Sequence, residues 1–433
     1  MAKVLIVGSG GREHALGWQF AKSDEVSDVI YAPGNAGTAE EEKARNIPID
    51  GSKKENFPAL LDFIRQESVD MVVVGPEAPL ADGIVDHFNS KGYENIFGPT
   101  RRASLLESDK FFSFDLMKDA GIPQADSVKC YSKDESIRAI NKRTTERGIV
   151  IKARGLTGGK GVTVCDSREQ AFQEIQQHSG RYGQEVLIAE RLFGQEFSVF
   201  GISDGNHVSP LEISLQDHKP LLDNDKGPNT GGMGAYCPVP FANREIVRNI
   251  VSNMMCPIVE RMNGSRTPYK GFLYAGMIMT ENGPKVLEFN IRFGDPECQP
   301  AMIMIKSGLF EAISEAARGS LSDRTKVEFN PGAACCVVLT SQGYPENYKT
   351  GLPISGLEEA SKIEGIKIFH ASTKREGSKI VTSGGRVLGV KGYSPNGIAD
   401  AQRLAYEAVS KINIPGGFSF RRDIAKKALL VVK

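Results

Sequence analysis

The chain lacks the features that mark several large classes of protein. Its seven cysteines are an odd number without Cys-x-x-Cys spacing, which argues against a disulfide framework and against a zinc ribbon. The six histidines are scattered, with no pair at metal-binding spacing, so we expect no histidine-based transition-metal site. No stretch approaches the roughly 18 apolar residues of a membrane-spanning helix.

An excess of charge of either sign is also missing. Lys+Arg and Asp+Glu number 53 each, so no global basic field indicates a nucleic acid or an anionic membrane. The apolar run near the start, 3–7, is too short for the core of a signal peptide and leads directly into a glycine turn. Because the adjacent Cys335 and Cys336 fall in an apolar run typical of a buried strand, a reducing environment fits best. We therefore expect a cytoplasmic protein with no nucleic-acid or membrane partner.

What is present is an ordinary globular composition on a long chain. At 433 residues, with 40% hydrophobic and 24% charged residues, several domains are expected. In the first quarter, short apolar runs alternate with turns and helical patterns, at 3–7, 29–32, 71–74 and 96–97. This rhythm predicts a doubly wound parallel sheet, in which the loops 8–14, 33–38 and 75–80 converge on one rim.

The first of these loops reads Gly8-Ser9-Gly10-Gly11-Arg12-Glu13-His14. A glycine turn between a strand and a helix places backbone N–H groups around a phosphate. The dinucleotide fingerprint is incomplete, because Glu13 stands at the third glycine position and Pro33-Gly34 ends the next strand without an acidic residue. A phosphate site and a purely structural turn both remain open, whereas an NAD-dependent dehydrogenase is disfavoured. Glu77, in the third loop, is either a substrate contact or a helix cap.

In the centre of the chain, a helix predicted from Lys110 to Asp119 precedes a strand, 150–153, that carries Lys152. A glycine-rich loop, 154–161, then leads into a second strand, 162–165. A glycine loop between two strands suits a lid whose N–H groups and lysines fold over phosphates, the alternative being a mobile hairpin. Lys152 and Lys160 would add point charges there.

Two later segments indicate further parts of a nucleotide site. The predicted strand 186–189 leads into Glu190–Glu196, where an exposed backbone suits an adenine edge and Glu196 suits ribose hydroxyls. The segment 216–236 is too polar and glycine-rich for a core. Long loops of this kind usually bind or close over ligands, the alternative being disorder.

The stretch 287–295 alternates apolar and polar residues with a period of two, as a half-buried strand does. On this interpretation Glu288, Asn290 and Arg292 share one face. The apolar residues packing on the other face are Leu287, Phe289, Ile291 and Phe293. A carboxylate and an amide oxygen suit magnesium, and an arginine grips a phosphate or carboxylate. By itself, the pattern also fits an edge strand with a solvated polar face.

With the lysine strand, the glycine lid, the Glu-x-Asn strand and Arg-Phe-Gly-Asp-Pro-Glu in this order, the chain resembles the ATP-grasp ligases. Motifs at 8–14, 33–38, 75–80, 227–234 and 288–297 make it similar to the phosphoribosylamine–glycine ligase family. The resemblance implies a multidomain α/β and α+β fold. Its parts would be an N-terminal Rossmann-like parallel sheet (1–103), an ATP-grasp domain (104–325) with a mobile lid (123–193), and a C-terminal mixed α/β domain (326–433).

The same resemblance implies a monomeric enzyme of de novo purine biosynthesis. It would ligate glycine to 5-phosphoribosylamine with ATP, through glycyl phosphate, giving glycinamide ribonucleotide, ADP and phosphate. Glu288 and Asn290 would bind Mg²⁺ or Mn²⁺. Arg292, Gly294 and Asp295 would lie near glycine and the acyl phosphate. The ATP site would be lined by Lys110, Lys152, Gly158, Gly159, Lys160, Gly161, Glu190, Leu192 and Glu196. The other substrates would meet Gly8, Gly10, Gly11, Arg12, Glu13, Asn35, Glu77, Asp217, Lys219, Asn229 and Thr230.

The chain departs from the family pattern mainly in the lid. The family reads nearer Lys-Ala-x-Gly-Leu-Ala-Ala-Gly-Lys-Gly, whereas Thr157-Gly158 replace the two alanines here, so we expect a more flexible lid. Arg154 would add charge near the phosphates. Gln195 stands where an acidic residue is common, and Pro220 where a basic one is. These departures bear on lid kinetics and nucleotide affinity more than on reaction type.

Two rival functions share the fold. Another ATP-grasp enzyme, such as a carboxylase, would lack the Gly-Pro-Asn-Thr-Gly-Gly-Met-Gly segment at 227–234. A non-catalytic nucleotide sensor would not need Lys152, Glu288 and Arg292 intact.

Overall fold

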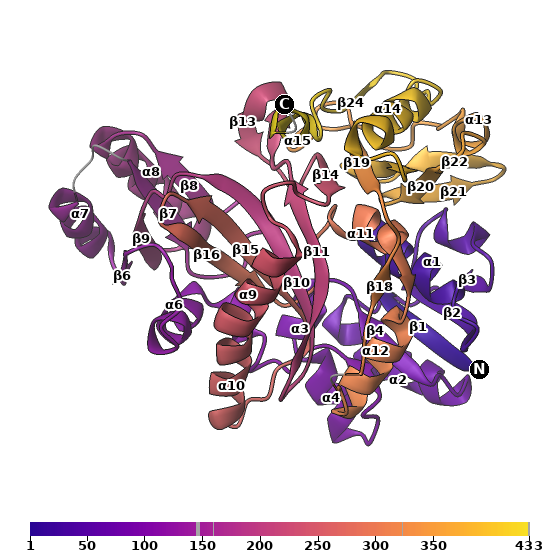
Figure 1. Ribbon diagram of the computed structural model, residues 1–433, viewed down its shortest axis with the longest axis horizontal. Coiled ribbons are helices and arrows are strands. Elements are labelled where there is room, and N and C mark those ends of the chain that lie inside the picture. The colour runs from indigo at the N-terminus through magenta and orange to yellow at the C-terminus, as the bar shows by residue number, and fades with distance from the viewer. Residues whose placement is uncertain (144–147, 159, 323, 432–433) are drawn as a thin grey trace.

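The computed structural model describes residues 1–143, 148–158, 160–322 and 324–431. Figure 1 shows a central sheet with a small lid on one side and the N-terminal and C-terminal parts stacked on the other. Within the described residues, no helix has both the length and the apolar character needed to cross a membrane.

The N-terminal part is a parallel sheet with strand order β3-β2-β1-β4-β5, as the sequence predicts. Val4 to Val7 of β1 are completely buried on both faces, which is typical of a strand inside a doubly wound sheet. The strands are β1 (Ala2–Gly8), β2 (Val26–Pro33), β3 (Ala44–Asn46), β4 (Met71–Val74) and β5 (Ile96–Phe97). The helices are α1 (Gly11–Ala21), α2 (Phe57–Gln66), α3 (Glu77–Ala81) and α4 (Ile84–Ser90).

The lid is an antiparallel sheet of order β6-β9-β7-β8, covered by two helices. Ser132 and Ser167 cap those helices by accepting hydrogen bonds from the N–H groups of Glu135 and Gln170. The strands are β6 (Ser127–Cys130), β7 (Ile149–Ala153), β8 (Val162–Cys165) and β9 (Val186–Glu190), and the helices are α7 (Lys133–Lys142) and α8 (Arg168–Tyr182). The lid follows α5 (Leu105–Ser108) and α6 (Lys110–Asp119), whose N-cap is Asp109.

The central sheet has the order β16-β15-β10-β11-β14-β19-β23-β20 and continues into the C-terminal part. Ala235 of β14 pairs with Cys336 of β19, so one ladder crosses the expected domain boundary near 325. Because one sheet spans this boundary, the sheet does not mark where one domain ends, and the division at residues 103 and 325 stays a prediction. The strands are β10 (Gln195–Asp204), β11 (Val208–Asp217), β14 (Gly234–Cys237), β15 (Lys270–Thr280), β16 (Gly283–Asn290), β19 (Ala333–Ser341), β20 (Ile366–His370) and β23 (Arg386–Ser394), with β24 (Phe418–Ser419) paired to β19.

Helices and short hairpins complete the fold. The helices are α9 (Arg244–Ile250), α10 (Cys256–Gly264), α11 (Cys298–Met304), α12 (Leu309–Arg318), α13 (Leu357–Ser361), α14 (Ile398–Val409) and α15 (Lys426–Val431). The two-stranded pairs are β12 (Pro220–Leu222) with β13 (Lys226–Asn229), β17 (Ile305–Ser307) with β18 (Glu328–Phe329), and β21 (Thr373–Glu376) with β22 (Lys379–Thr382).

The strand predicted across 287–295 is interrupted. Gly276 pairs with Glu288 but Met277 pairs with Val286, so Leu287 is an extra, bulged residue. Strand β16 ends at Asn290, and Arg292 lies in the bend beyond it. The predicted alternation is therefore wrong at Leu287, which is only half-buried and lines a cavity with Glu288.

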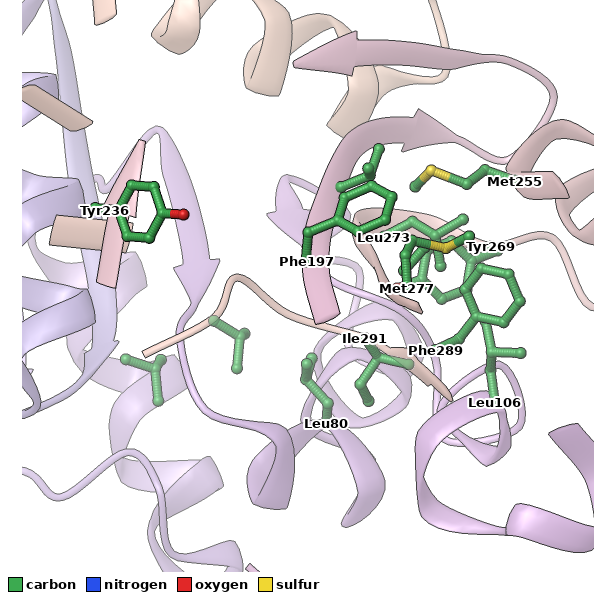
Figure 2. Close-up of a cluster of buried hydrophobic side chains, with 14 of the residues drawn as sticks. Leu80, Leu106, Phe197, Tyr236, Met255, Tyr269, Leu273, Met277, Phe289 and Ile291 are labelled. Atoms are coloured by element: carbon green, nitrogen blue, oxygen red, sulfur yellow. The ribbon is translucent and has the colours of Figure 1, made fainter. Parts of the chain in front are cut away.

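The apolar partners of this strand do pack into the core. Phe289 and Ile291 are each 1% exposed and lie among Leu273, Met277 and Phe197, as Figure 2 shows. Burying such side chains contributes about 1.5–3 kcal/mol each. This packing fixes the backbone that carries the polar residues between them.

Two further sequence expectations need correction. The segment 216–236 is not a structureless loop, because it holds the hairpin β12–β13 and then most of β14. Met233, just before β14, and Tyr236 within it are completely buried. Strand pairing on both sides of β14 satisfies its glycine-rich backbone. In addition, helix α1 begins at Gly11, so the second half of the 8–14 motif forms the first helical turn rather than a loop.

Candidate active site

Four of the predicted site residues line one small cavity in the central sheet: Glu196, Asp217, Lys219 and Glu288. They come from β10, β16 and the end of β11. The ammonium nitrogen of Lys219 lies 3.9 Å from a carboxylate oxygen of Glu196 and 3.9 Å from one of Glu288. The fold thus places one positive charge between two negative ones.

The electrostatics at Glu288 favour an ionised carboxylate. Burial by itself would raise the pKa of Glu288, but the charges of Lys219, Lys110 and Lys152 lower it to about 2. Burial lowers the pKa of Lys152, and the charge of Glu288 opposes that effect. These three ammonium groups bring positive charge to Glu288, which suits a site for phosphate groups.

Lys152 also joins the lid to the central sheet. Its Nζ donates a hydrogen bond of 3.0 Å to the backbone carbonyl of Leu287, the bulged residue of β16. The predicted nucleotide lysine and the predicted metal strand therefore meet directly.

The donor set of Glu288 and Asn290 fits a magnesium-type cation. Across the parts of the chain that the structure describes, no group of three or more His, Cys, Asp and Glu side chains forms a closed metal cage. Magnesium is commonly held by one or two protein ligands and completes its shell with water and phosphate oxygens. An ionised Glu288 with the amide oxygen of Asn290 supplies such a partial shell.

Arg292 is held between two acidic side chains. Its Nε lies 3.3 Å from Glu77 Oε2, and its Nη2 donates to Glu107 Oε1 at 3.2 Å. Burial lowers the pKa of Arg292, but Glu107 and Glu77 outweigh it and raise the pKa. Burial raises the pKa of Glu107, which also accepts a 2.8 Å hydrogen bond from the N–H of Ile291. Glu107 lies in the short helix α5 outside any motif, so no local signal in the sequence points to it.

Asp295 contacts the C-terminal part of the chain. Its Oδ2 accepts a hydrogen bond of 2.8 Å from Arg386 Nη2, and its Oδ1 accepts one of 2.8 Å from Gln299 Nε2. Arg386, on β23, is a second residue to which no local signal in the sequence points.

The position of Gly294 has no room for a side chain, since a Cβ there would lie 2.4 Å from the carboxylate of Glu297.

Glu13 explains the broken dinucleotide fingerprint. Its Oε2 accepts a 2.7 Å hydrogen bond from the N–H of Gly10, and its Oε1 accepts one of 2.6 Å from Arg12 Nε. A Cβ at Gly75 would lie 2.1 Å from the same carboxylate. Arg12 Nη1 in turn donates to the carbonyl of Phe293 at 3.1 Å. The Glu13 side chain thus fills the space that glycines leave.

The three N-terminal loops converge on one rim, as predicted. The amide nitrogen of Asn35 donates to the carbonyls of Ser9 and His370, each at 2.9 Å. Gly8 has a φ of +126°, and a Cβ at Gly11 would lie 2.5 Å from Gln299 Nε2. This rim therefore faces the segment that follows Asp295. Which of its residues touch a substrate stays a prediction.

The glycine lid closes on itself through Thr157. The Thr157 hydroxyl accepts a 2.8 Å hydrogen bond from the N–H of Gly161, and its carbonyl accepts one of 3.2 Å from Lys160. Gly158 has a φ of +59°, a conformation that favours glycine. Thr157 therefore forms two hydrogen bonds within the loop, and the expected greater flexibility of the lid stays a prediction. Gly159 lies outside the described residues.

Arg154 does not offer a free charge to phosphates. Its Nη2 lies 2.6 Å from Asp109 Oδ2, and its Nη1 lies 3.1 Å from Glu185 Oε1. The expectation for this residue is wrong, because two carboxylates neutralise it. Asp109 also caps α6, so Arg154 connects the lid to the helix that begins at Lys110.

Four predicted contacts remain. Glu190 and Leu192, predicted for the nucleotide, lie at and just after the end of β9, whereas Asn229 and Thr230, predicted for the other substrates, lie at and just after the end of β13. Glu190 Oε1 accepts a 3.0 Å hydrogen bond from the N–H of Asp126. Leu192 packs against a small apolar cluster that includes Val150 and Ala189. Thr230 donates through both its N–H and its hydroxyl to the carbonyl of Lys219, each at 2.8 Å, whereas Asn229 is exposed on β13.

Three models of one protein family match successive parts of the chain. They are the N domain, the ATP-grasp (A) domain and the C domain of phosphoribosylglycinamide synthetase, at residues 2–107, 108–298 and 334–427. The chain belongs to the phosphoribosylglycinamide synthetase family.

Individual relatives agree with this membership. A phosphoribosylamine–glycine ligase from Rhodopirellula baltica is 45% identical over 99% of this chain and 98% of its own length. The crystal structure of a phosphoribosylamine–glycine ligase from Thermotoga maritima has a TM-score of 0.81 and 31% identity, and the match covers 98% of this chain and all of that one. The crystal structure of a biotin carboxylase–beta-gamma-ATP complex from Campylobacter jejuni has a TM-score of 0.72, and the match covers 96% of this chain and 92% of that one. At 13% identity it shows the fold alone.

Proposed function

We propose that this phosphoribosylglycinamide synthetase family member ligates glycine to 5-phosphoribosylamine. The products are glycinamide ribonucleotide, ADP and phosphate, in de novo purine biosynthesis. The proposal rests on Glu288, whose carboxylate is kept ionised by the charges of Lys219, Lys110 and Lys152. The neighbouring residue, Leu287, accepts a hydrogen bond through its carbonyl from Lys152 of the lid. Positive charge beside an ionised carboxylate is what phosphoryl transfer from ATP with a divalent cation requires.

The reaction needs an activated carboxylate, because glycine and an amine do not condense usefully in water. An oxygen of the glycine carboxylate attacks the γ-phosphorus of ATP, and the bond to the β–γ bridging oxygen breaks as ADP leaves. The amine nitrogen of phosphoribosylamine then attacks the carbonyl carbon of glycyl phosphate. Phosphate departs with the electron pair of the C–O bond, and the nitrogen loses a proton.

The residues of the site supply positioning and charge. Lys110, Lys152 and Lys219 neutralise charge that develops on the transferred phosphoryl group. Arg292, kept protonated by Glu77 and Glu107, is placed to orient the glycine carboxylate. A cation held by Glu288 and Asn290, Mg²⁺ or Mn²⁺, supplies Lewis-acid neutralisation of the phosphate oxygens. Closure of the lid shields the acyl phosphate from water.

We further infer the finer assignments that the sequence suggests. The glycine loops Gly8–Gly11, with Arg12, Glu13, Asn35 and Glu77, serve the ribose phosphate. Gly158, Lys160, Gly161, Glu190, Leu192 and Glu196 serve ATP. The enzyme acts as a monomer in the cytoplasm, and small molecules are its partners.

The proposal is tested by ADP release with ATP, glycine and freshly prepared phosphoribosylamine. We expect ADP formation only when both glycine and the amine are present, together with glycinamide ribonucleotide detected by mass spectrometry. Bicarbonate in place of glycine serves as the control for a carboxylase. Absence of ADP with the full substrate set, or ADP formation that depends on bicarbonate instead, contradicts the proposal.

A further inference from the structure

Arg421, near the end of the chain, is a buried arginine whose partners lie on a distant hairpin. Its side chain is 1% exposed. Nη1 donates to the carbonyl of Pro220 at 3.1 Å and pairs with Asp225 Oδ1 at 2.9 Å. Nε and Nη2 donate to the two carboxylate oxygens of Asp423 at 2.8 and 2.7 Å. All three of its nitrogens donate hydrogen bonds, and two of its contacts are with the hairpin β12–β13 and its turn.

Neighbouring residues hold the same hairpin turn. Lys427 Nζ lies 2.6 Å from Asp225 Oδ2. The N–H of Arg422 donates to Asp223 Oδ1 at 2.7 Å, and the N–H of Asn224 donates to Asp423 Oδ2 at 2.8 Å. Figure 1 accordingly shows α15 beside β13. Each residue of the turn 223–225 thus has a partner in the segment 421–427.

The hairpin needs external support. Asn224 and Asp225 have φ values of 58° and 56°, which are uncommon for residues other than glycine. A two-stranded hairpin alone is at best marginally stable in water. The support is anchored to α14, because the hydroxyl of Tyr406 donates to the carbonyl of Arg421 at 2.8 Å and accepts from the N–H of Ile424 at 3.0 Å.

The base of the hairpin carries a residue of the cavity. Lys219 directly precedes Pro220, and its ammonium lies between Glu196 and Glu288. We propose that Arg421, Asp423 and Lys427 form a latch that positions Lys219 for the triphosphate end of ATP. Arg421 is thus a positioning residue that acts through the hairpin, and the inference rests on the proposed function.

The latch has a defined kinetic signature. When it is broken, the hairpin samples other conformations and the fraction of molecules with Lys219 in place falls. The apparent dissociation constant of the nucleotide equals its intrinsic value divided by that fraction, so it rises as the fraction falls. Saturating nucleotide returns all molecules to the conformation with Lys219 in place. A latch defect therefore raises KM for ATP and leaves kcat nearly unchanged.

The test compares Arg421→Met and Arg421→Lys with the matched control Arg403→Met. Arg403 is an exposed arginine of α14 that pairs only with Asp400 and Glu407 of its own helix. The dissociation constant of β,γ-methylene-ATP with magnesium is measured by calorimetry, alongside KM and kcat. We expect about a tenfold rise in the dissociation constant and in KM for Arg421→Met, a smaller rise for Arg421→Lys and none for Arg403→Met. Amide hydrogen exchange at 220–229 becomes faster in Arg421→Met.

Unchanged nucleotide binding in a folded Arg421→Met protein overturns the proposal. A fall in kcat by the same factor as the rise in KM also overturns it. If that variant does not fold, Asp225→Asn breaks the latch from the half-exposed hairpin side. We expect about a threefold weaker binding there, and wild-type binding overturns the proposal. Because the analogue reads binding alone, a wild-type protein that binds it but makes no amide contradicts the proposed function and leaves the latch standing.

Discussion

The ammonium of Lys152 donates a hydrogen bond of 3.0 Å to the backbone carbonyl of Leu287, although 135 positions separate the two residues. Leu287 is the bulged residue of β16, directly before Glu288. The lid strand and the strand of the predicted metal ligands are therefore coupled through one contact. We therefore expect a bound phosphate to compete with this carbonyl for the ammonium and so to link nucleotide binding to the position of the lid.

Replacement of Lys152 by methionine should weaken ATP binding. The variant removes a buried ammonium that faces Glu288, while methionine keeps most of the side-chain length. We expect KM for ATP to rise about tenfold, a loss of about 1.4 kcal/mol of binding. Lys118→Met, at an exposed position of α6, should behave like the wild type. Equal KM values for the two variants contradict a role for Lys152 in nucleotide binding.

Replacement of Glu288 by glutamine should abolish most activity and leave the fold intact. The amide keeps the shape of the side chain but removes the only carboxylate of the proposed pair of metal ligands. We expect kcat/KM to fall at least about 100-fold, or about 2.7 kcal/mol, with the largest loss at limiting magnesium. Glu281→Gln, in the exposed turn before β16, is the matched control. Near-wild-type turnover of Glu288→Gln at limiting magnesium would falsify the metal role.

Replacement of Glu107 by glutamine should damage both stability and catalysis. Glu107 lies beneath Arg292 and also accepts from the N–H of Ile291. Removing one partner of a buried charge pair costs about 3–5 kcal/mol in unfolding free energy. We expect a lower urea midpoint and a higher KM for glycine. A variant with unaltered KM for glycine shows that Glu107 supports the fold but does not position Arg292.

Replacement of Arg154 by alanine should loosen the lid. It separates the lid from Asp109, the cap of α6, and from Glu185. We expect faster amide hydrogen exchange in β7 and β9 and a rise of about threefold in KM for ATP, since the competent fraction falls. Arg248→Ala removes an exposed arginine paired with Glu212 and serves as the control. Unchanged exchange rates in the lid contradict the assigned tie.

Acid should destabilise the contact between the N-terminal and C-terminal parts. His14 Nδ1 accepts from the N–H of His370, so the neutral ring donates through Nε2 to Glu41 at 2.8 Å. Burial lowers the pKa of His14. Burial would raise the pKa of Glu41, but His14 and Lys367 lower it to about 2.

Both pKa shifts act in the same direction. In the unfolded chain, His14 binds a proton below about pH 6.5 and Glu41 below about pH 4.5. In the folded chain both groups bind a proton only at lower pH, so acid favours the unfolded state. The contribution of His14 and Glu41 to the free energy of unfolding is therefore fully present above about pH 6.5 and is lost as the pH drops toward about 2. Urea midpoints measured from pH 7 to 3.5 should decline less steeply below pH 4.5 in Glu41→Gln than in Glu40→Gln, the exposed neighbour. Parallel curves contradict the assignment.

Much of the fold could be predicted because its signals are local. Strands β4 and β8 follow from apolar runs bounded by turn residues, and both have the predicted bounds. Helix α6 begins at Lys110 because Asp109 caps it. The glycines of the 8–14 motif indicate a close approach of backbone, which the Glu13 carboxylate makes.

Other parts of the site have no local signal. The bulge at Leu287 arises from the pairing of β16 with β15, so the strand pattern alone does not reveal which side Leu287 faces. Segment 233–236 looks like a loop in sequence, yet it is buried because β11 and β19 flank it. Arg154 looks like a phosphate ligand until Asp109 and Glu185 are placed beside it.

By itself, the sequence determined the parallel N-terminal sheet and the strands on either side of the glycine loop, whereas the roles of Glu288, Asn290 and Arg292 stay predictions that the family resemblance implies. The sheet and the strands depend on residue periodicity and on spacing within short segments. Only the tertiary structure decided which partner each charged group meets. Lys152 meets the carbonyl of Leu287, and the ion pairs are Glu107 with Arg292, Arg386 with Asp295 and Arg421 with Asp225. The physical reason is that a buried charge needs a partner of opposite charge or a hydrogen-bond acceptor. When that partner is far away in the chain, the residues near the charge in the sequence do not indicate which residue it is.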